Sequence, residues 1–286
     1  MQWLISCALS ATLAFTILGA CHDSNANSGP GPTMELTASM GALVRDEADA
    51  ALNALTLPTL LTPLGAPAGP PCAAPSPATD GDGDGIPDDA TYIFTAPPCR
   101  FTGIRGGTLD LVGQLRIQDP APAAAGFGYA ATLVALRAAF TGPGDSPEVY
   151  SVTRNGTRAL AGSVAGLQLT ADLQVARTFP GLPDAAVDET WTARFTPETP
   201  LQINQPLPGG TLDIAGTLAW TRGTESFDLT VTTPTPLHYN PGCTGDSRRI
   251  DAGELRAAST FDGTDGYIRV RWSDCGKDPE VRFVPS

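Results

Sequence analysis

The sequence predicts an all-β protein with antiparallel sheets, arranged as a sandwich or a curved sheet and preceded by one short N-terminal helix. From Tyr92 onward, short runs of Thr, Val, Leu, Tyr and Phe alternate with Gly, Pro and Asn-Gly, a pattern typical of strands and turns. Helical periodicity is found in one segment before this region. A ten-residue segment recurs, which indicates two similar β units.

The first twenty residues are apolar and uncharged, and they end in Leu18-Gly19-Ala20-Cys21. Small residues before Cys21 and polar ones after it predict a cleaved export signal at 1–20 better than a membrane span. Leu-Gly-Ala-Cys resembles the lipobox of bacterial lipoproteins, which implies that Cys21 carries lipid as the mature N-terminus. Because the first Lys or Arg is Arg45, the usual basic start is missing. A plain secretory signal and a retained membrane anchor are the alternatives.

Residues 21–35 are rich in Ser, Asn, Gly and Pro and predict a flexible tether. In the lipoproteins that the chain resembles, an Asp one place before Asp23 retains the protein at the inner membrane. We therefore expect the outer membrane or the cell surface, with membrane contact through the N-terminal lipid. The net charge of −13 and the single Lys argue against a nucleic-acid partner. A protein, glycan or lipid partner stays open.

An amphipathic helix is predicted at 36–56, followed by a Pro-rich linker at 57–90. The helix prediction depends on apolar residues at three- and four-residue spacing: Leu36, Met40, Leu43, Val44, Ala48, Ala51, Leu52 and Leu55. We expect this apolar face to pack on the body, although a partner protein could also cover it.

Twelve strands are predicted after the linker. They are 91–96, 107–118, 127–140, 148–154, 157–163, 167–178, 188–196, 209–221, 225–233, 252–260, 266–273 and 280–284. Asn155-Gly156 predicts a hairpin between two of them, because a type I′ turn needs positive φ at both central residues.

An internal repeat divides this region into β unit 1 at 91–184 and β unit 2 at 185–286. Residues 106–115 return as 209–218 with seven of ten identical, and 91–95 match 192–196 less closely. The alternative is chance similarity within a Thr- and Gly-rich β protein. Two similar sheets can bury their apolar faces against each other.

An acidic loop at the end of the linker is the candidate metal site. The carboxylates of Asp80, Asp82, Asp84 and Asp88 and the backbone carbonyl of Ile86 stand at the spacing of calcium ligands. The loop resembles those of EF-hands, dockerins and thrombospondin type-3 repeats, which implies a structural calcium ion. Position twelve holds Thr91 instead of a bidentate acid, so we expect weak affinity unless Asp89 compensates. A solvated acidic turn is the alternative.

Four cysteines remain once Cys7 leaves with the signal and Cys21 takes lipid, and an even number in an exported protein predicts disulfides. They are Cys72, Cys99, Cys243 and Cys275. Proximity in sequence favours Cys72–Cys99 and Cys243–Cys275, although three pairings are open. Cys72 and Cys99 would bracket the acidic loop.

No catalytic residues are predicted. Gly144-Asp145-Ser146 and Gly245-Asp246-Ser247 resemble the start of a secreted esterase motif, but His238 is the single serious candidate for a base and lacks that family's preceding Asp. Such triplets are also common in turns. The aromatic residues of the second unit could stack on carbohydrate, but core packing is the stronger expectation.

The second unit resembles uncharacterised bacterial β-rich lipoproteins. The likeness rests on Trp191, Phe195, Gly210-Thr211, Cys243 and Trp272-x-x-Cys275. The resemblance implies export and β structure, and it implies no particular activity. We therefore expect a lipid-anchored cell-envelope protein with a non-enzymatic binding or structural role. The alternatives are an envelope hydrolase acting on carbohydrate and a carrier of a hydrophobic ligand.

Overall fold

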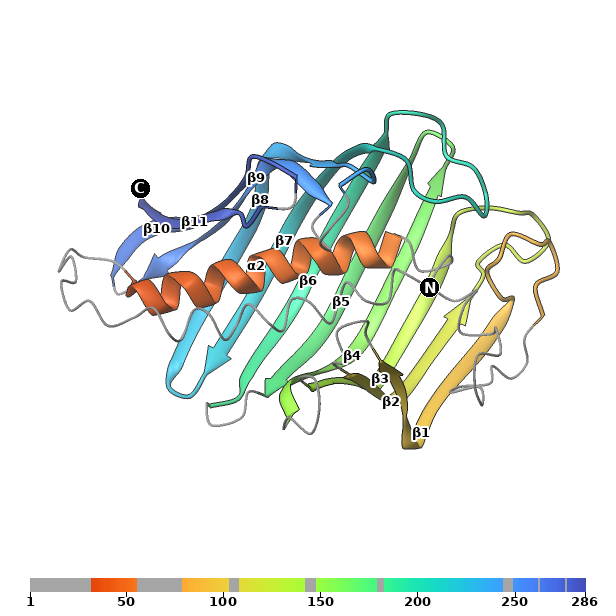
Figure 1. Cartoon of the computed structure of the whole chain (residues 1–286), viewed down its shortest axis with the longest axis horizontal. Helices are drawn as coiled ribbons and strands as arrows, with labels where there is room; N and C mark the ends of the chain where they lie inside the picture. The colour runs from red at the N-terminus through yellow and green to blue at the C-terminus, as the bar shows by residue number, and fades with distance from the viewer. Residues whose placement is uncertain are drawn as a thin grey trace.

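The computed structural model describes residues 32–55, 79–102, 108–141, 148–178, 183–243, 249–261, 263–275 and 277–286. It contains one antiparallel sheet of eleven strands that pair in chain order from β1 to β11 (Figure 1). The all-β prediction is confirmed. All the strands belong to one sheet, which curves around a helix, so the fold is the curved sheet and not the sandwich.

Most strands lie close to the predicted segments, although β4 spans two of them and β1 and β8 each continue six residues beyond the predicted end. The strands are β1 (Asp89–Thr102), β2 (Thr108–Gln118), β3 (Tyr129–Thr141), β4 (Glu148–Ser163), β5 (Gly166–Thr178), β6 (Ala185–Pro197), β7 (Gly210–Arg222), β8 (Glu225–Tyr239), β9 (Ile250–Phe261), β10 (Thr264–Trp272) and β11 (Glu280–Pro285).

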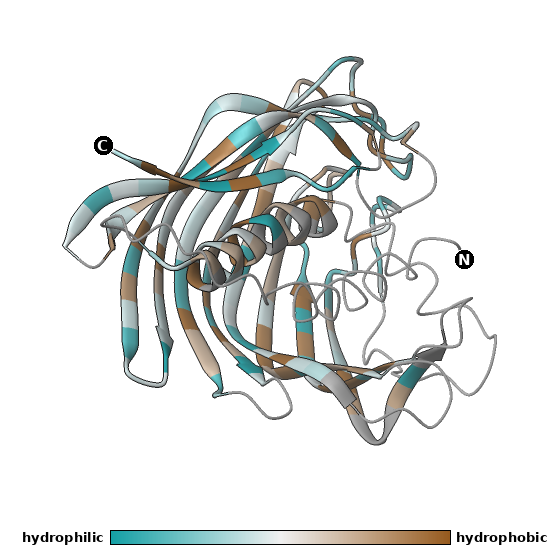
Figure 2. Cartoon of the chain, turned by 60° about the vertical axis from the view of Figure 1, so that its left-hand side comes forward, coloured by the Kyte–Doolittle hydropathy of each residue, from teal (hydrophilic) through white to brown (hydrophobic). Residues whose placement is uncertain are grey.

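The two faces of the sheet differ because side chains alternate along each strand. In β6, Val187, Trp191, Ala193 and Phe195 are buried, whereas their neighbours are exposed. The same alternation runs through β5. Most of the buried side chains form a hydrophobic core with the helix, so the inner, concave face is mainly apolar and the outer face is polar. Figure 2 shows the matching alternation of hydrophobic and hydrophilic residues along the strands.

Helix α2 (Met34–Leu55) lies in the concave side of the sheet (Figures 1 and 2). Thr33 caps it, since its Oγ1 accepts a hydrogen bond from the backbone N–H of Leu36 at 3.1 Å. The eight apolar residues that predicted the helix are all buried, so its apolar face packs on the body as expected. Burial of each large apolar side chain contributes about 1.5–3 kcal/mol.

The helix lies very close to the last strand at Gly41. A Cβ atom at this position would lie 2.2 Å from Cγ1 of Val281 on β11. Among the described helical residues, no segment is long and apolar enough to cross a bilayer.

The hairpin predicted at Asn155-Gly156 is wrong, because β4 runs unbroken through both residues. The Asn155 side chain accepts a 2.7 Å hydrogen bond from the backbone N–H of Ala135 on β3, beside a break in the β3–β4 register. Gly156 has φ of 125°, and a Cβ there would lie 2.2 Å from the carbonyl oxygen of Asp172. The Asn-Gly pair therefore marks an irregularity inside a strand, where β5 approaches closely.

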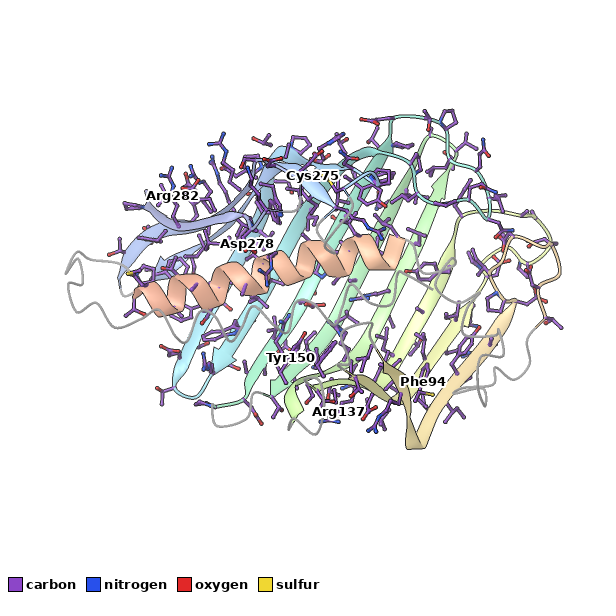
Figure 3. The ribbon with its side chains drawn as sticks, in the orientation of Figure 1. Phe94, Arg137, Tyr150, Cys275, Asp278 and Arg282 are labelled. Atoms are coloured by element: carbon purple, nitrogen blue, oxygen red, sulfur yellow. A yellow bond between two sulfur atoms is a disulfide. The ribbon has the colours of Figure 1, made fainter. Side chains whose placement is uncertain are left out.

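A second, small core lies beyond this irregularity. It is built around Leu109 and Phe140, and the rings of Phe140 and Tyr150 stack with centroids 4.5 Å apart. Figure 3 labels Tyr150 at this end of the sheet. Gly113, with φ of 115°, lies at the matching break in the β2–β3 register. The neighbouring irregularities let the ends of β2, β3 and β4 turn away from the main core.

The repeated segments occupy β2 and β7, and their upstream partners lie in β1 and β6. Their pairing differs, because Phe94 lies opposite Gly113, whereas its repeat equivalent Phe195 lies opposite Leu212. The proposed boundary at 184/185 separates β5 from β6, which pair with each other in the continuous sheet. The division into two related units stays a prediction.

Candidate functional site

Several predicted site residues lie outside the described part of the chain. These are the lipidation residue Cys21, the cysteine Cys72 and the triplets at 144–146 and 245–247. Cys99 is described and is buried on β1. The pairing Cys72–Cys99 therefore stays a prediction.

The acidic loop brings three of its predicted ligands together. One carboxylate oxygen from each of Asp80, Asp82 and Asp84 lies within 4.8 Å of the other two. Asp80 accepts hydrogen bonds from the N–H groups of Gly83 at 2.8 Å and Gly85 at 3.0 Å, which curls the chain around its carboxylate. The two glycines have φ of 77° and 89°, the left-handed region in which glycine carries no steric penalty.

Asp84 is the buried member of this group, at 3% exposure. Its two carboxylate oxygens accept N–H bonds from Ile86 at 2.8 Å and Gly126 at 2.9 Å. Oδ2 of Asp82 is buried and has no hydrogen-bond partner among the described residues. A buried carboxylate oxygen is costly without a donor or a cation.

The last predicted ligands lie differently. Asp88 accepts an N–H bond from Gly81 at 2.9 Å and closes the loop, without joining the cluster of three acids. The Ile86 side chain is buried in the core. Asp89 does not replace the missing acid at Thr91, because Arg116 holds it through two bonds of 2.8 and 2.5 Å. This pair also holds the pKa of Asp89 below its usual range.

The connection between β6 and β7 packs against the acidic loop. Its Leu201 and Leu207 are buried, and Asn204 reaches the loop at Gly83. Together with the end of α2, the acidic loop and this connection line a mostly apolar cavity of about 60 Å³ that is partly open to solvent. Such a volume holds a few water-sized groups and no lipid chain.

The predicted disulfide Cys243–Cys275 is present, with Cα atoms 5.4 Å apart. It joins the segment that follows β8 to the segment that follows β10. Figure 3 labels Cys275 near the rim of the sheet opposite Tyr150. Because β9 lies between these two strands, the bond ties three neighbouring strand ends together.

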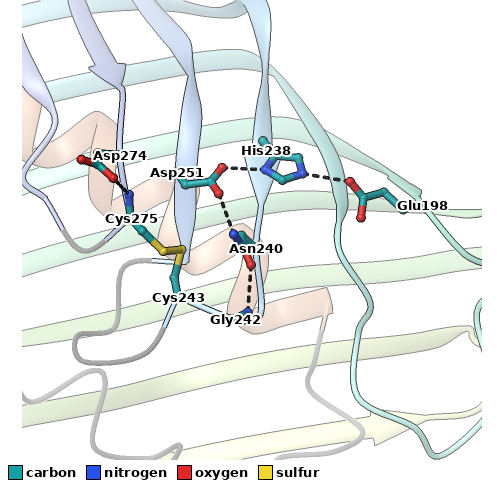
Figure 4. A network of polar contacts seen from close by, with 8 residues as sticks. All are labelled: Glu198, His238, Asn240, Gly242, Cys243, Asp251, Asp274 and Cys275. Atoms are coloured by element: carbon teal, nitrogen blue, oxygen red, sulfur yellow. Dashed lines mark hydrogen bonds and ion pairs between the residues drawn. A yellow bond between two sulfur atoms is a disulfide. The ribbon is translucent and has the colours of Figure 1, made fainter.

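A polar network beside the disulfide was not predicted (Figure 4). Nδ1 of His238 lies 2.6 Å from Oδ1 of Asp251, and Nε2 lies 3.0 Å from Oε1 of Glu198. The amide of Asn240 donates to Oδ2 of Asp251 at 2.7 Å. The hydrogen bonds to Glu198 and Asp251 raise the pKa of His238 above its ordinary value.

No local pattern in the sequence predicts this network. His238 and Asp251 lie thirteen positions apart, and His238 and Glu198 forty apart. They meet because β7 pairs with both β6, which Glu198 follows, and β8, and because β8 also pairs with β9. Because both ring nitrogens of His238 contact carboxylates, neither is available as a base for a serine nucleophile in this arrangement.

The aromatic residues of the second unit are mostly core residues, as expected. Trp191, Trp220, Tyr239 and Trp272 are buried, and the half-buried Tyr267 packs under the guanidinium of Arg256 at 4.6 Å. They leave no exposed stacking platform among the described strands.

A hollow of about 450 Å³ lies on the outer face of β5 to β8. Asp172, Asp188 and Asp228 line it with their exposed side chains, beside Gln174 and a cross-strand row of threonines. Asp172 and Asp188 lie on adjacent strands and are offset by two residues, because Asp172 pairs with Thr190. This offset places them about 7–8 Å apart.

Comparison with known proteins gives no family for the chain, since no family model, curated protein or solved structure matches it.

Proposed function

We propose that the protein is a lipid-anchored component of the bacterial cell envelope, with a non-enzymatic binding or structural role. The observation that carries this proposal is that the apolar inner face is filled by the protein's own helix α2. The body therefore offers other molecules its polar outer face. A body held by lipid at Cys21, through a short tether, would present that face close to the outer membrane or the cell surface.

The anchor is tested by expressing the full chain in a bacterial host that is fed a labelled fatty acid. We expect label on the wild-type protein and its recovery with membranes. Cys21→Ala should lose both, whereas Cys7→Ala serves as the matched control. Label that persists on Cys21→Ala would refute lipid attachment at this residue.

We further propose that the acidic loop binds a calcium ion with a structural role. The close approach of Asp80, Asp82 and Asp84 supports this, as does the buried oxygen of Asp82 that lacks a donor. The full calcium geometry needs six to eight oxygens, so water must supply part of the shell and the affinity should be weak.

Thermal unfolding with chelator and with millimolar calcium tests this site. Wild type should unfold at a higher temperature in calcium. Asp82→Asn should lose that response without losing stability in chelator, because it removes a buried charge. Asp184→Asn, an exposed change far from the loop in sequence, should respond as wild type does. An unchanged wild-type midpoint would contradict calcium binding.

An envelope hydrolase acting on carbohydrate is the second candidate, and the outer hollow is the observation that favours it. Asp172 and Asp188 lie on adjacent strands of this hollow with both side chains exposed, and a pair of carboxyl groups is what inverting glycosidases use. A panel of glycans, esters and peptides decides between the two functions. Turnover that Asp188→Asn abolishes and Asp184→Asn preserves would establish the hydrolase and overturn the non-enzymatic role.

The carrier hypothesis finds less support. It requires a large apolar cavity, and the mostly apolar pocket beside the end of α2 has a volume of about 60 Å³. A carrier would have to displace α2 from the inner face, at the cost of exposing its eight buried apolar side chains.

A further inference from the structure

His238 contacts two carboxylates that belong to different parts of the chain. Asp251 lies on β9 and has one fifth of its side chain exposed, whereas Glu198 follows β6 and is mostly exposed. A neutral imidazole carries one N–H and cannot donate to both carboxylates. Both contacts are hydrogen bonds only when the ring is doubly protonated.

The β8–β9 pairing is weak where this network lies. Its register shifts three times between Thr232 and Tyr239. Pro234 and Pro236 of β8 have no N–H to donate. On β9, Gly253 has φ of 118° and lies against Leu237. The backbone ladder between β8 and β9 is therefore irregular here, and side-chain contacts add to it.

On the other side, Glu198 begins the β6–β7 connection that covers the apolar cavity. Its backbone N–H bonds to the carbonyl of Gly209 at 2.8 Å, so the two ends of the connection are held together. Leu201 is fixed inside by an N–H bond of 2.9 Å to the carbonyl of Val164. The Glu198 side chain links the base of this connection to β8.

We propose that His238 is a proton-dependent clamp that ties the β6–β7 connection to the β8–β9 junction. When the ring loses one proton, the other stays on Nδ1 for the closer and less exposed Asp251. The bond to Glu198 is then lost, and the connection over the apolar cavity opens more often. This clamp requires neither the lipid nor calcium. A result that refutes the clamp therefore leaves the proposed function untouched.

The surroundings of the ring favour the charged form. From β7, the residue paired with His238 is the uncharged Thr211, and the turn after β8 contributes the amide of Asn240. Arg249 is directed to the hydroxyl of Tyr239, and Lys277 to Asp274 beyond the disulfide. The two carboxylates are thus the charges that contact the ring, and they raise the pKa of His238.

Imidazole NMR on the purified mature chain tests the protonation state. The protein has two histidines, so His22→Ala leaves His238 as the single signal. We expect both ring nitrogens to be protonated at pH 6.5 and to titrate above that value. A ring that titrates at or below 6.5 would overturn the clamp.

Hydrogen exchange followed by mass spectrometry tests the opening. Protection of residues 198–209, corrected for intrinsic exchange, should fall about two- to fivefold as pH rises through the titration of His238, the scale of an exposed ion pair. Residues 166–178 of β5 should stay unchanged. His238→Gln should remove the pH dependence, and Glu198→Gln should reduce it if His238→Gln does not fold. If these variants lost as much protection with rising pH as wild type does, the proposal would be refuted.

Discussion

The side-chain amide of Asn204 donates a hydrogen bond of 3.1 Å to the carbonyl of Gly83, across 121 positions of sequence. Asn204 has a left-handed φ of 60° and lies in the connection between β6 and β7. Leu201 and Leu207 of this connection are buried in the core. The acidic loop is therefore shaped by a residue of the second half of the sheet as well as by its own glycines.

We predict that Gly85→Ala destabilises the protein more than Gly83→Ala. Both glycines have positive φ, which costs an alanine about 1–2 kcal/mol. A Cβ on Gly85 would also lie 2.4 Å from Oδ1 of Asn204, whereas a Cβ on Gly83 meets nothing within 4 Å. Urea denaturation should show the larger loss for Gly85→Ala.

The same comparison has an internal check. Asn204→Ala removes the side chain that a Cβ on Gly85 would meet. If this clash is the cause, Gly85→Ala should destabilise the Asn204→Ala protein only as much as Gly83→Ala destabilises wild type. Equal losses for the two glycine variants would show that the loop moves freely away from Asn204.

Gly41→Ala should destabilise the packing of α2 against β11. Helix propensity alone favours Ala over Gly by about 1 kcal/mol, so a loss of stability would identify the contact with Val281 as the dominant effect. We expect a net loss of about 1–3 kcal/mol, the usual cost of overpacking. Adding Val281→Ala to Gly41→Ala should restore part of the lost stability. A double-mutant cycle by urea denaturation measures this coupling.

Loss of the Cys243–Cys275 disulfide should cost about 3–4 kcal/mol, because the bond closes a loop across a sequence separation of 32 residues. The double change Cys243→Ser with Cys275→Ser should lower the denaturation midpoint. Wild type with a reducing agent should match it. Peptide mapping without reduction should recover residues 243 and 275 in one linked fragment, and another pairing would contradict the structure.

The stability difference between wild type and His238→Gln should depend on pH. His238 has a raised pKa when folded, so its contribution is complete below the ordinary value of about 6.5 and is lost as pH rises through the folded pKa. Asp251 has a lowered pKa, because its hydrogen bonds to Asn240 and His238 outweigh the effect of its burial. Its contribution is lost only in acid. Denaturation from pH 6 to 9 should therefore show a falling difference.

The sequence correctly predicts the elements that depend on local pattern. The spacing of Leu36, Met40, Leu43 and their neighbours predicts α2, because an amphipathic helix shows its apolar face at fixed intervals. The alternation of apolar and polar residues likewise predicts β5 and β6. Asn155-Gly156 misleads, because the conformation that suits a turn also suits an irregular strand position.

By itself, the sequence determined the all-β class, the helix at Met34–Leu55 and the approximate limits of most strands, because these follow from patterns among residues near in sequence. It favoured the pairing Cys243–Cys275 without excluding the other pairings. Tertiary structure alone decided that the strands form one curved sheet around α2. It also decided that Glu198, His238 and Asp251 meet and that Asn204 supports the acidic loop. These relations depend on strand order and curvature, which bring distant residues together and leave little trace in local sequence.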